Sequence, residues 1–276
     1  MDSAHMTIDT QLLIGSSFET GQEAKEQILN PRTGGLILDV PEASTAQVDR
    51  AGAAARKAFE TWSRTTPAER AAALLRIADR VEAEADSFAA LEALNCGKPI
   101  NAARNDEIPA IVDCYRFFAG AVRCQHGAVA GEYLAGHTSM IRRDAIGVIA
   151  SIAPWNYPLM MMAWKIAPAI GAGNTVVFKP SEQTPLTALA MARIFAEVLP
   201  EGVVNIVLGR GETVGSALIG HPKVAMISLT GDIATGRKIL EAATKTIKRT
   251  HLELGGKAPV IVFDDADLEA TVSGLR

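Results

Sequence analysis

From residue 147 onward the sequence alternates short apolar runs with longer amphipathic runs, and this alternation constrains the fold more than any other feature. Short apolar runs bounded by turn residues are typical of buried strands, and apolar positions at helical spacing are typical of helices. Strands that alternate with helices in this way form a parallel sheet that is covered on both faces. We therefore expect an α/β fold with a doubly wound, mostly parallel, Rossmann-like sheet. The expected strands are 147–153, 175–179, 203–208, 225–229 and 259–263, and the expected helices are 159–170, 186–198, 213–219 and 234–244.

The first part of the chain predicts a hairpin, a helical region and a second hairpin. The turn cluster Asn30-Pro31-Arg32-Thr33-Gly34-Gly35 is flanked by apolar residues, which favours a hairpin over 28–40. Thr66-Pro67-Ala68-Glu69 has the spacing of a capping box with proline at the first helical position, so a helix is expected to start there. A further helix is expected over 106–122, and a protruding hairpin arm over 131–143.

The composition is that of a packed globular protein without a strong electrostatic field. Hydrophobic residues make up 48% of the chain and charged residues 21%, a balance typical of folded domains. The net charge of −4 gives little attraction for phosphate backbones, so no nucleic acid is expected as a partner. The apolar run over 159–164 is ended by Lys165, well short of the ~20 residues that a membrane span needs. No membrane association is therefore expected.

The N-terminal residues, the cysteines and the histidines indicate the cellular compartment of the protein and whether it binds a metal ion. The first six residues lack the basic start and long apolar core of a secretory signal, so we expect a cytoplasmic protein. Cys96, Cys114 and Cys124 form no CxxC pair, and the five histidines have no metal-ligand spacing, so no disulfide framework and no bound metal are expected. We expect the cysteines to be packing residues, because free cysteine behaves as a small buried hydrophobe. The alternative is that one of them is a nucleophilic thiolate.

The ends of the expected strands carry the candidate chemistry, because ligands of open parallel sheets bind beyond the carboxyl ends of the strands. The first strand is followed by Pro154-Trp155-Asn156-Tyr157-Pro158, a stiff turn that holds the Asn156 amide at this edge. An amide in this position can donate a hydrogen bond to a developing oxyanion. The alternative is that Asn156 caps the helix that begins near Pro158.

The second strand ends in Lys179-Pro180-Ser181-Glu182. An acid near the end of the second strand of a dinucleotide fold accepts hydrogen bonds from the adenosine ribose and repels a 2′-phosphate. Glu182 therefore favours NAD over NADP, and Lys179 can bind ribose or phosphate oxygens as a compact charge. The alternative is a solvated loop in which Ser181 and Glu182 begin a helix.

Glycine turns follow the third and fourth strands: Gly209-Arg210-Gly211-Glu212-Thr213-Val214-Gly215 and Thr230-Gly231-Asp232-Ile233-Ala234-Thr235-Gly236. Exposed backbone N–H groups and the helix dipole at such turns favour an anion such as pyrophosphate. Neither turn is the GxGxxG of a first strand–helix connection, and a single glycine turn is often only a turn. Two of them at one sheet edge, beside Glu182, favour a dinucleotide.

The segment His251-Leu252-Glu253-Leu254-Gly255-Gly256-Lys257 sets a carboxylate among apolar residues and glycines. A partly buried glutamate can be tuned to act as a general base that activates water. The alternative is a surface glutamate on a short strand.

Four of these segments together resemble the aldehyde dehydrogenase superfamily in order and spacing, over essentially the whole chain. They are Pro154-Trp155-Asn156-Tyr157-Pro158, Lys179-Pro180-Ser181-Glu182, Thr230-Gly231 with Gly236, and Glu253-Leu254-Gly255-Gly256-Lys257. Within the superfamily the chain resembles the bacterial γ-aminobutyraldehyde dehydrogenases, which are close to the betaine aldehyde dehydrogenases. The segments that carry this finer resemblance are Asn95-Cys96-Gly97-Lys98-Pro99, Asn105-Asp106-Glu107-Ile108-Pro109, Gly131-Glu132-Tyr133 and Ser151-Ile152-Ala153-Pro154-Trp155-Asn156-Tyr157-Pro158-Leu159-Met160.

The resemblance implies oxidation of an aldehyde to a carboxylic acid through a thiohemiacetal, with hydride transfer to NAD and hydrolysis of a thioester. It implies that Asn156 stabilises the oxyanion and that Glu253 activates the hydrolytic water, with Lys165 in a supporting role near that base. The substrate it implies is an aminoaldehyde of the 4-aminobutanal type, as in putrescine breakdown. The alternatives are a betaine-aldehyde or broad-specificity aldehyde dehydrogenase, and a non-catalytic NAD-binding fragment. The cofactor-binding residues that it implies are Ala153, Pro154, Trp155, Lys179, Pro180, Ser181, Glu182, Gly211, Gly215, Gly231, Asp232, Ile233, Ala234 and Thr235.

The resemblance also implies a division of the chain. Residues 1–130 and 144–256 are expected to form the NAD-binding domain, 131–143 an oligomerisation arm, and 257–276 the start of a catalytic domain. The family is built of homo-oligomers, with a tetramer expected for the complete protein. The nucleophilic cysteine of the family belongs just downstream of Arg276, so we expect the chain to be a fragment that lacks it.

Two further features bear on ligands. Asp232 stands where the family usually has serine, and a carboxylate there can cap a helix but repels phosphate. Acidic residues on the 106–122 helix offer an approach for a substrate ammonium group, and nearby aromatic rings offer faces for a cation. The alternative is an ordinary solvated helix face. The acids are Asp106, Glu107 and Asp113, and the rings are those of Tyr157 and Trp164.

Overall fold

A computed structural model describes residues 10–125 and 127–275 of the chain. The expectation about the first six residues therefore lies outside the described residues. The strands are β1 (Leu12–Ile14), β2 (Ser17–Glu19), β3 (Lys25–Leu29), β4 (Leu36–Pro41), β5 (Ala128–Leu134), β6 (His137–Ile141), β7 (Val148–Ile152), β8 (Thr175–Lys179), β9 (Val204–Ile206), β10 (Val224–Thr230) and β11 (Arg249–Glu253). The helices are α1 (Thr45–Trp62), α2 (Pro67–Ala83), α3 (Ala85–Cys96), α4 (Ile100–Ala102), α5 (Ile108–Ala121), α6 (Pro158–Gly171), α7 (Leu186–Val198), α8 (Ser216–Gly220), α9 (Ile233–Thr244) and α10 (Leu268–Gly274), with π-helical turns η1 (Ala103–Glu107) and η2 (Gly211–Gly215).

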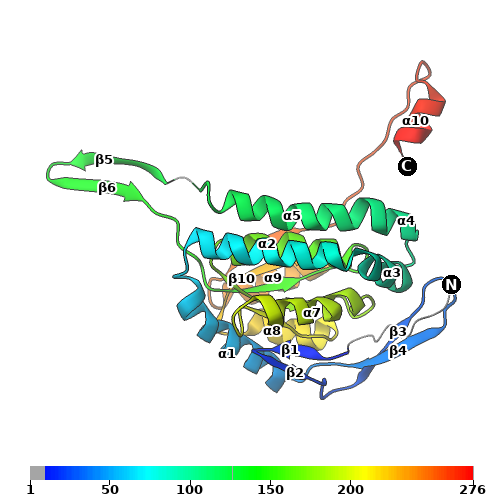
Figure 1. Cartoon of the computed structure of the whole chain (residues 1–276), viewed down its shortest axis with the longest axis horizontal. Coiled ribbons are helices and arrows are strands. Elements are labelled where there is room, and N and C mark those ends of the chain that lie inside the picture. Colours follow the sequence, from blue (N-terminus) through cyan, green and yellow to red (C-terminus); the bar gives the residue numbers. More distant parts are fainter. Residues whose placement is uncertain (1–9, 126, 276) are drawn as a thin grey trace.

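A seven-stranded sheet in the order β11-β10-β7-β8-β9-β1-β2 forms the centre of the molecule (Figure 1). Strands β7 to β11 are parallel to their neighbours, whereas β1 and β2 add an antiparallel edge. All five side chains of β8 are buried, because helices cover both faces of a parallel sheet. The expected α/β, mostly parallel sheet is therefore confirmed.

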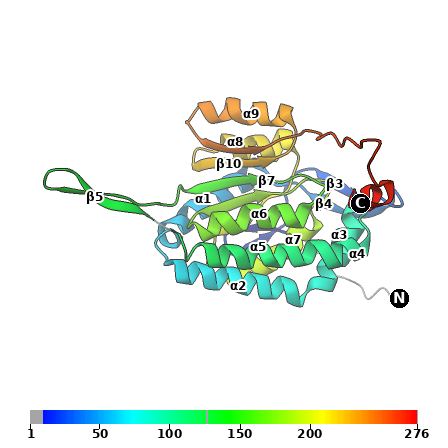
Figure 2. The same ribbon diagram turned by 90° about the horizontal axis from the view of Figure 1, so that it is seen from above.

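Helices pack on the two faces of the sheet in separate layers (Figure 2). α6 and α7 cover one face, while α1, α8 and α9 pack on the opposite face. α2 and α5 pack against each other and against α6, and so add an outer layer beyond α6. This is the doubly wound arrangement predicted from the alternating pattern. Among the residues that the structure describes, no helix is both long and apolar enough to cross a membrane.

The helix starts follow the local sequence. Thr66 accepts a hydrogen bond from the Glu69 backbone N–H, and the Glu69 carboxylate accepts one from the Thr66 N–H, which completes the capping box at the start of α2. The helix expected over 213–219 begins earlier, as the π-helical turn η2, because the Gly215 N–H bonds to the Arg210 carbonyl five residues back.

The expected strand over 259–263 is wrong. These residues form neither helix nor strand, and Val260, Ile261 and Phe263 are exposed. A strand needs a neighbour to pair its backbone groups, and no described strand lies alongside this segment. The fifth parallel strand is instead β11, which pairs with β10 from Met226↔Arg249 to Thr230↔Glu253. The segment beyond β11 extends away from the body and ends in α10 (Figure 1).

The two predicted hairpins are both confirmed. β3 and β4 pair in an antiparallel ladder around the predicted turn cluster. β5 and β6 form an arm that protrudes from the body (Figure 1), with Tyr133, Leu134 and Met140 exposed along it. The division into domains and the role of the arm between subunits stay predictions.

Candidate functional site

A cleft of about 730 Å³ lies beyond the carboxyl ends of the parallel strands. It opens where the chain order reverses between β10 and β7, the position at which open α/β sheets bind ligands. The structure thus brings together residues at or just beyond the carboxyl ends of five strands, β7 to β11. The lining residues that the sequence predicted are Ala153, Pro154, Trp155, Asn156, Lys179, Ser181, Glu182, Gly211, Gly231, Asp232, Thr235 and Glu253.

Lys179 and Glu182 form the polar floor of this cleft. The Lys179 ammonium, which is almost fully buried, donates to the Pro180 carbonyl at 3.0 Å and lies 3.3 Å from the Glu182 carboxylate. Burial lowers the pKa of Lys179, and the charge of Glu182, the first of the opposing causes, raises it again. The alternative in which Ser181 and Glu182 begin a helix is wrong, because α7 begins only at Leu186.

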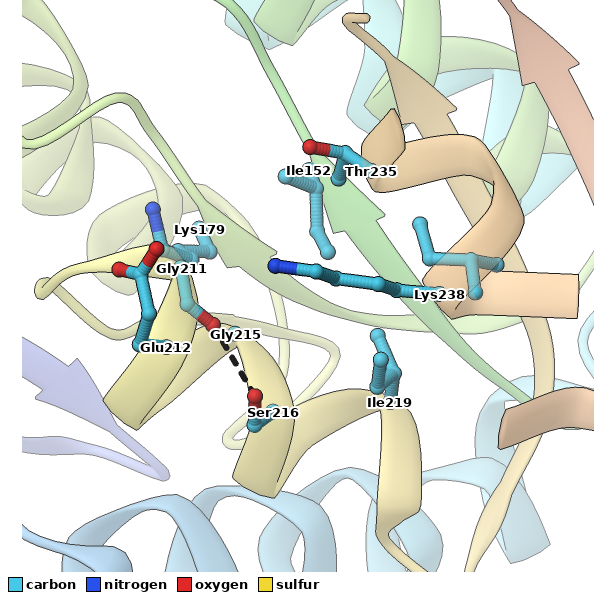
Figure 3. A pocket seen from close by; sticks show the side chains of 10 residues that line it. Ile152, Lys179, Gly211, Glu212, Gly215, Ser216, Ile219, Thr235 and Lys238 are labelled. Carbon is cyan, nitrogen blue, oxygen red and sulfur yellow. Dashed lines mark hydrogen bonds between the residues drawn. The ribbon is translucent and has the colours of Figure 1, made fainter. Parts of the chain in front are cut away.

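A second hollow of about 280 Å³ adjoins the cleft and is mainly apolar (Figure 3). Ile152 and Ile219 lie on opposite sides of it, and the side chain of Lys238 extends between them. Gly215 lines this hollow rather than the cleft, whereas Lys179 and Gly211 line both. The volume and mainly apolar lining of this hollow, the apolar slot, can accommodate a heterocyclic base next to the polar cleft.

Four residues of this slot were predicted, and six were not: Ile152, Glu212, Ser216, Ile219, Lys238 and Ile239. Ile219 lies four residues after Gly215, and Ile239 lies four residues after Thr235, so each is on the same helix face as a predicted site residue. That spacing is the signal from which the slot could have been predicted. Three predicted cofactor residues, Pro180, Ile233 and Ala234, line neither hollow.

The turn between β10 and α9 carries a fixed negative charge. Asp232 caps α9 by accepting a hydrogen bond from the Thr235 N–H at 2.8 Å and another from the Thr235 hydroxyl at 2.7 Å. These two hydrogen bonds lower the pKa of Asp232, so the carboxylate stays charged at the rim of the cleft. The Gly231 N–H is bonded to the Glu253 carbonyl at 3.0 Å and is therefore not free for an anion.

Asn156 lines the cleft and does not cap α6. The N-cap of α6 is Tyr157, without a side-chain hydrogen bond, so the capping alternative for Asn156 is wrong. Contacts on both sides hold the turn: Thr184 donates to the Trp155 carbonyl at 3.2 Å, and the Lys98 ammonium lies 3.9 Å from the centre of the Tyr157 ring. The Asn156 amide is thus presented to the cleft from a fixed turn.

Glu253 lies at the end of β11 and lines the cleft, but the prediction that it is partly buried is wrong. The residue is exposed rather than partly buried among apolar groups, because β11 is an edge strand.

Lys165 is buried and donates to the Ser228 hydroxyl at 3.0 Å. Burial lowers the pKa of Lys165 to about 8, against the opposing charge of Glu253. Lys165 and Glu253 are therefore within electrostatic reach of each other.

None of the three cysteines lines the cleft, although the Cys96 thiol lies 3.8 Å from the carbonyl of Trp155, which does. Cys96 and Cys114 are half-buried, and burial raises the pKa of both thiols, that of Cys114 to about 11. These two residues fit the predicted packing role. Cys124 is exposed in the turn after α5, so a packing role is wrong for that residue. Within the described part of the chain, no group of three or more His, Cys, Asp or Glu side chains could hold a metal ion.

The fold and the cleft together define an α/β domain of the dinucleotide-binding class, with its site at the switch point of a doubly wound sheet. Residues 18–276 match the model of the aldehyde dehydrogenase family, and the chain belongs to this family.

Curated relatives and solved structures agree with this assignment. Betaine aldehyde dehydrogenase of Mesorhizobium japonicum is 42% identical over 261 residues, which are 94% of this chain and 53% of that protein. Phenylacetaldehyde dehydrogenase of Pseudomonas fluorescens is 42% identical over 96% of this chain and 54% of its own length. The crystal structure of PnpE in complex with NAD is 44% identical with a TM-score of 0.93, over 97% of this chain and 55% of that one. The NAD complex of an aldehyde dehydrogenase from Bacillus cereus is 37% identical with a TM-score of 0.93, over 98% of this chain and 56% of that one. The chain thus spans about half the length of the relatives that it matches.

Proposed function

We propose that the chain forms the NAD-binding part of an NAD-dependent aldehyde dehydrogenase. The observation that carries the proposal is the apolar slot directly beside the polar cleft of Lys179 and Glu182. Adenine matches the apolar lining of the slot, and the Glu182 carboxylate can accept hydrogen bonds from the ribose hydroxyls. The backbone N–H groups of the turn at Gly211 can bind the pyrophosphate. Family members of similar fold have been solved as NAD complexes, which supports the choice of cofactor.

In the proposed reaction, this chain supplies the groups that stabilise charge and move protons. Bound NAD supplies the acceptor for the hydride of the aldehyde. The Asn156 amide donates a hydrogen bond to the oxyanion that forms when the aldehyde carbonyl is attacked. Glu253 takes a proton from the water that hydrolyses the acyl intermediate. Because none of the three cysteines lines the cleft, we assign the nucleophile to the half of the family's length that this chain does not span.

The proposal is tested by calorimetric titration of the purified chain with NAD, together with an absorbance assay for NADH in the presence of 4-aminobutanal. We expect NAD to bind, NADP to bind more weakly because of Glu182, and no NADH to form. A chain that does not bind NAD would overturn the proposed function. NADH formation by the chain alone would instead overturn the assignment of the nucleophile, and would point to Cys96, Cys114 or Cys124.

Replacing Asp232 by serine is expected to tighten NAD binding about two- to fivefold, because serine still caps α9 and removes a charge that repels the pyrophosphate. Calorimetric titration of both proteins with NAD measures the effect. The matched control is Asp267→Ser, since Asp267 caps α10 in the same way and does not line the cleft. An unchanged or weaker affinity in Asp232→Ser would contradict the prediction.

For the substrate, we propose an aldehyde that carries a positive charge, of the 4-aminobutanal type formed in putrescine breakdown. A groove of about 480 Å³ between α5 and α6 holds Asp113 beside the aromatic rings of Phe117 and Trp164, which is a suitable setting for an ammonium group. Glu107 and Tyr157, which were also predicted to bind the ammonium group, already contact Lys98. Glu107 accepts a hydrogen bond from the Lys98 ammonium at 2.6 Å, and this ammonium covers one face of the Tyr157 ring. The betaine aldehyde dehydrogenase relative supports a cationic aldehyde, whereas the phenylacetaldehyde dehydrogenase relative favours the broad-specificity alternative.

In an enzyme that includes the second half of the family's length, Asp113→Asn is expected to lower kcat/KM for 4-aminobutanal about fivefold, the size of a single exposed charge–ammonium attraction. The kcat/KM for butanal should stay the same, because butanal carries no charge. Asp106→Asn serves as the control, since Asp106 is exposed and lies outside the groove. Equal losses for both aldehydes, or none for either, would rule out charge recognition by Asp113.

We further propose that the β5–β6 arm joins subunits of a homo-oligomer, and that the complete protein is a cytoplasmic tetramer. The exposed apolar side chains of Tyr133, Leu134 and Met140 on this arm support the proposal, because apolar surface of this kind marks interaction sites.

A further inference from the structure

A buried carboxylate outside the cleft holds the turn that borders it. Glu42 follows β4, and only 5% of its surface is exposed. Its Oε1 atom accepts a hydrogen bond from the Arg210 backbone N–H at 3.2 Å, and its Oε2 atom accepts one from the Thr213 hydroxyl at 2.9 Å. Both donors belong to the turn that carries Gly211, although they lie 168 and 171 residues away in the chain.

Two further contacts fasten the β3–β4 hairpin to the same turn. The Ala43 N–H donates to the Leu208 carbonyl at 2.7 Å. The Arg210 guanidinium donates to both oxygens of Glu26 on β3, at 2.8 and 3.2 Å. The Arg210 guanidinium also lies 3.8 Å from the Glu42 carboxylate. The N-terminal hairpin and the residues that follow it therefore contact the turn through the backbone, through two ion pairs of Arg210 and through the hydrogen bonds of the buried Glu42.

The turn needs such support because of its own sequence. Gly209 has a φ of +152°, which side chains rarely adopt, and a Cβ atom there would lie 2.3 Å from Val214 and 3.2 Å from Glu42. Glycine-rich backbone loses much conformational freedom when it is ordered. A turn that is already ordered before the ligand arrives avoids this loss on binding, and so raises the affinity.

Glu42 also acts on Lys179 through its charge. Burial lowers the pKa of Lys179, while the carboxylates of Glu182, Glu42 and Glu212 all oppose this shift. The charge of Glu42 thus favours the protonated form of Lys179, although the Glu42 side chain does not line the cleft.

We propose that Glu42 is a positioning residue for the dinucleotide, which preorders the 209–215 turn without touching the ligand. This inference rests on the proposed NAD-binding function. Nothing in the local sequence around Glu42 indicates the role, because the partners are set by the docking of the hairpin on the sheet.

Calorimetric titration of the whole chain with NAD tests the inference. Glu42→Ala is expected to weaken NAD binding about tenfold, the size of lost hydrogen bonds to a charged group. Glu42→Gln is expected to weaken it less, because the amide oxygen can still accept one hydrogen bond. Asp39→Ala is the matched control, since Asp39 is an exposed acid on the same hairpin, and its affinity should equal that of the unmodified chain.

A pH series separates positioning from a general loss of structure. In Glu42→Gln, Lys179 should lose its proton at lower pH than in the unmodified chain, so NAD affinity should begin to fall at lower pH. A merely structural role would reduce the affinity by the same factor at every pH.

If the unmodified chain binds NAD and both Glu42 variants bind it equally well, the inference is wrong while the proposed function stands. If the unmodified chain does not bind NAD, the proposed function itself fails. Should Glu42→Ala fail to fold, Glu42→Gln and its pH series decide the question.

Discussion

Replacing Phe178 by alanine is expected to lower the free energy of unfolding by about 3–5 kcal/mol, the range for a fully buried phenylalanine. Phe178 is fully buried in β8, where it pairs with Ser151 of β7 on one side and with Ile206 of β9 on the other. Helices cover both faces of this central strand, so the surrounding side chains can collapse only partly into the space that the ring leaves. The loss therefore combines the transfer of the ring from water with the cost of a cavity.

The measurement is urea denaturation of the whole chain, followed by circular dichroism. Phe117→Ala is the matched control because the same side chain on α5 is 62% exposed. A change within about 0.5 kcal/mol is expected for this control. If the two variants had the same midpoint, β8 would not be the centre of the core.

Asn156→Ala is expected to lower kcat about 10²- to 10³-fold in an enzyme that includes the second half of the family's length, the usual effect of removing one oxyanion donor. The amide is presented to the cleft by a turn whose flanking residues are fixed by Thr184 and Lys98. Alanine leaves these flanking contacts in place, so the turn should keep its course and the protein its stability.

Single-turnover kinetics with saturating NAD measure this effect on the chemical step. Asn101→Ala on the exposed α4 provides the control and should retain the full rate. A loss of less than tenfold in Asn156→Ala would remove Asn156 from the proposed oxyanion site. A large loss accompanied by a lower melting temperature would indicate that the amide is needed for folding rather than for chemistry.

The sequence predicted the strand–helix order well because the information for each element is local. The capping box at Thr66 satisfies its own backbone N–H groups within one turn, whatever surrounds it. The bounds of β8 were predicted to the residue, since its apolar centre, Val176-Val177-Phe178, is typical of a strand that is covered on both faces. The apolar residues 259–263 do not form the predicted strand, because the described structure offers no neighbouring strand with which they could pair.

The candidate site was only partly predictable for the same reason. Lys179, Glu182 and Asn156 follow strands directly, so strand order alone brings them to one edge of the sheet. The exposure of Glu253 depends on β11 being an edge strand, which no local pattern shows. The engagement of Glu107 by Lys98 likewise depends on how the chain turns between α3 and α5.

By itself, the sequence determined the α/β class, the order of the elements and the residues that stand at the carboxyl ends of the strands, because periodicity and turn chemistry act over a few neighbouring residues. Only the tertiary structure decided which residues form the apolar slot between α8 and α9, and that Glu42 holds the 209–215 turn. The physical reason is that these contacts join segments far apart in the chain, and the winding of the sheet and the docking of the hairpin fix which of them meet.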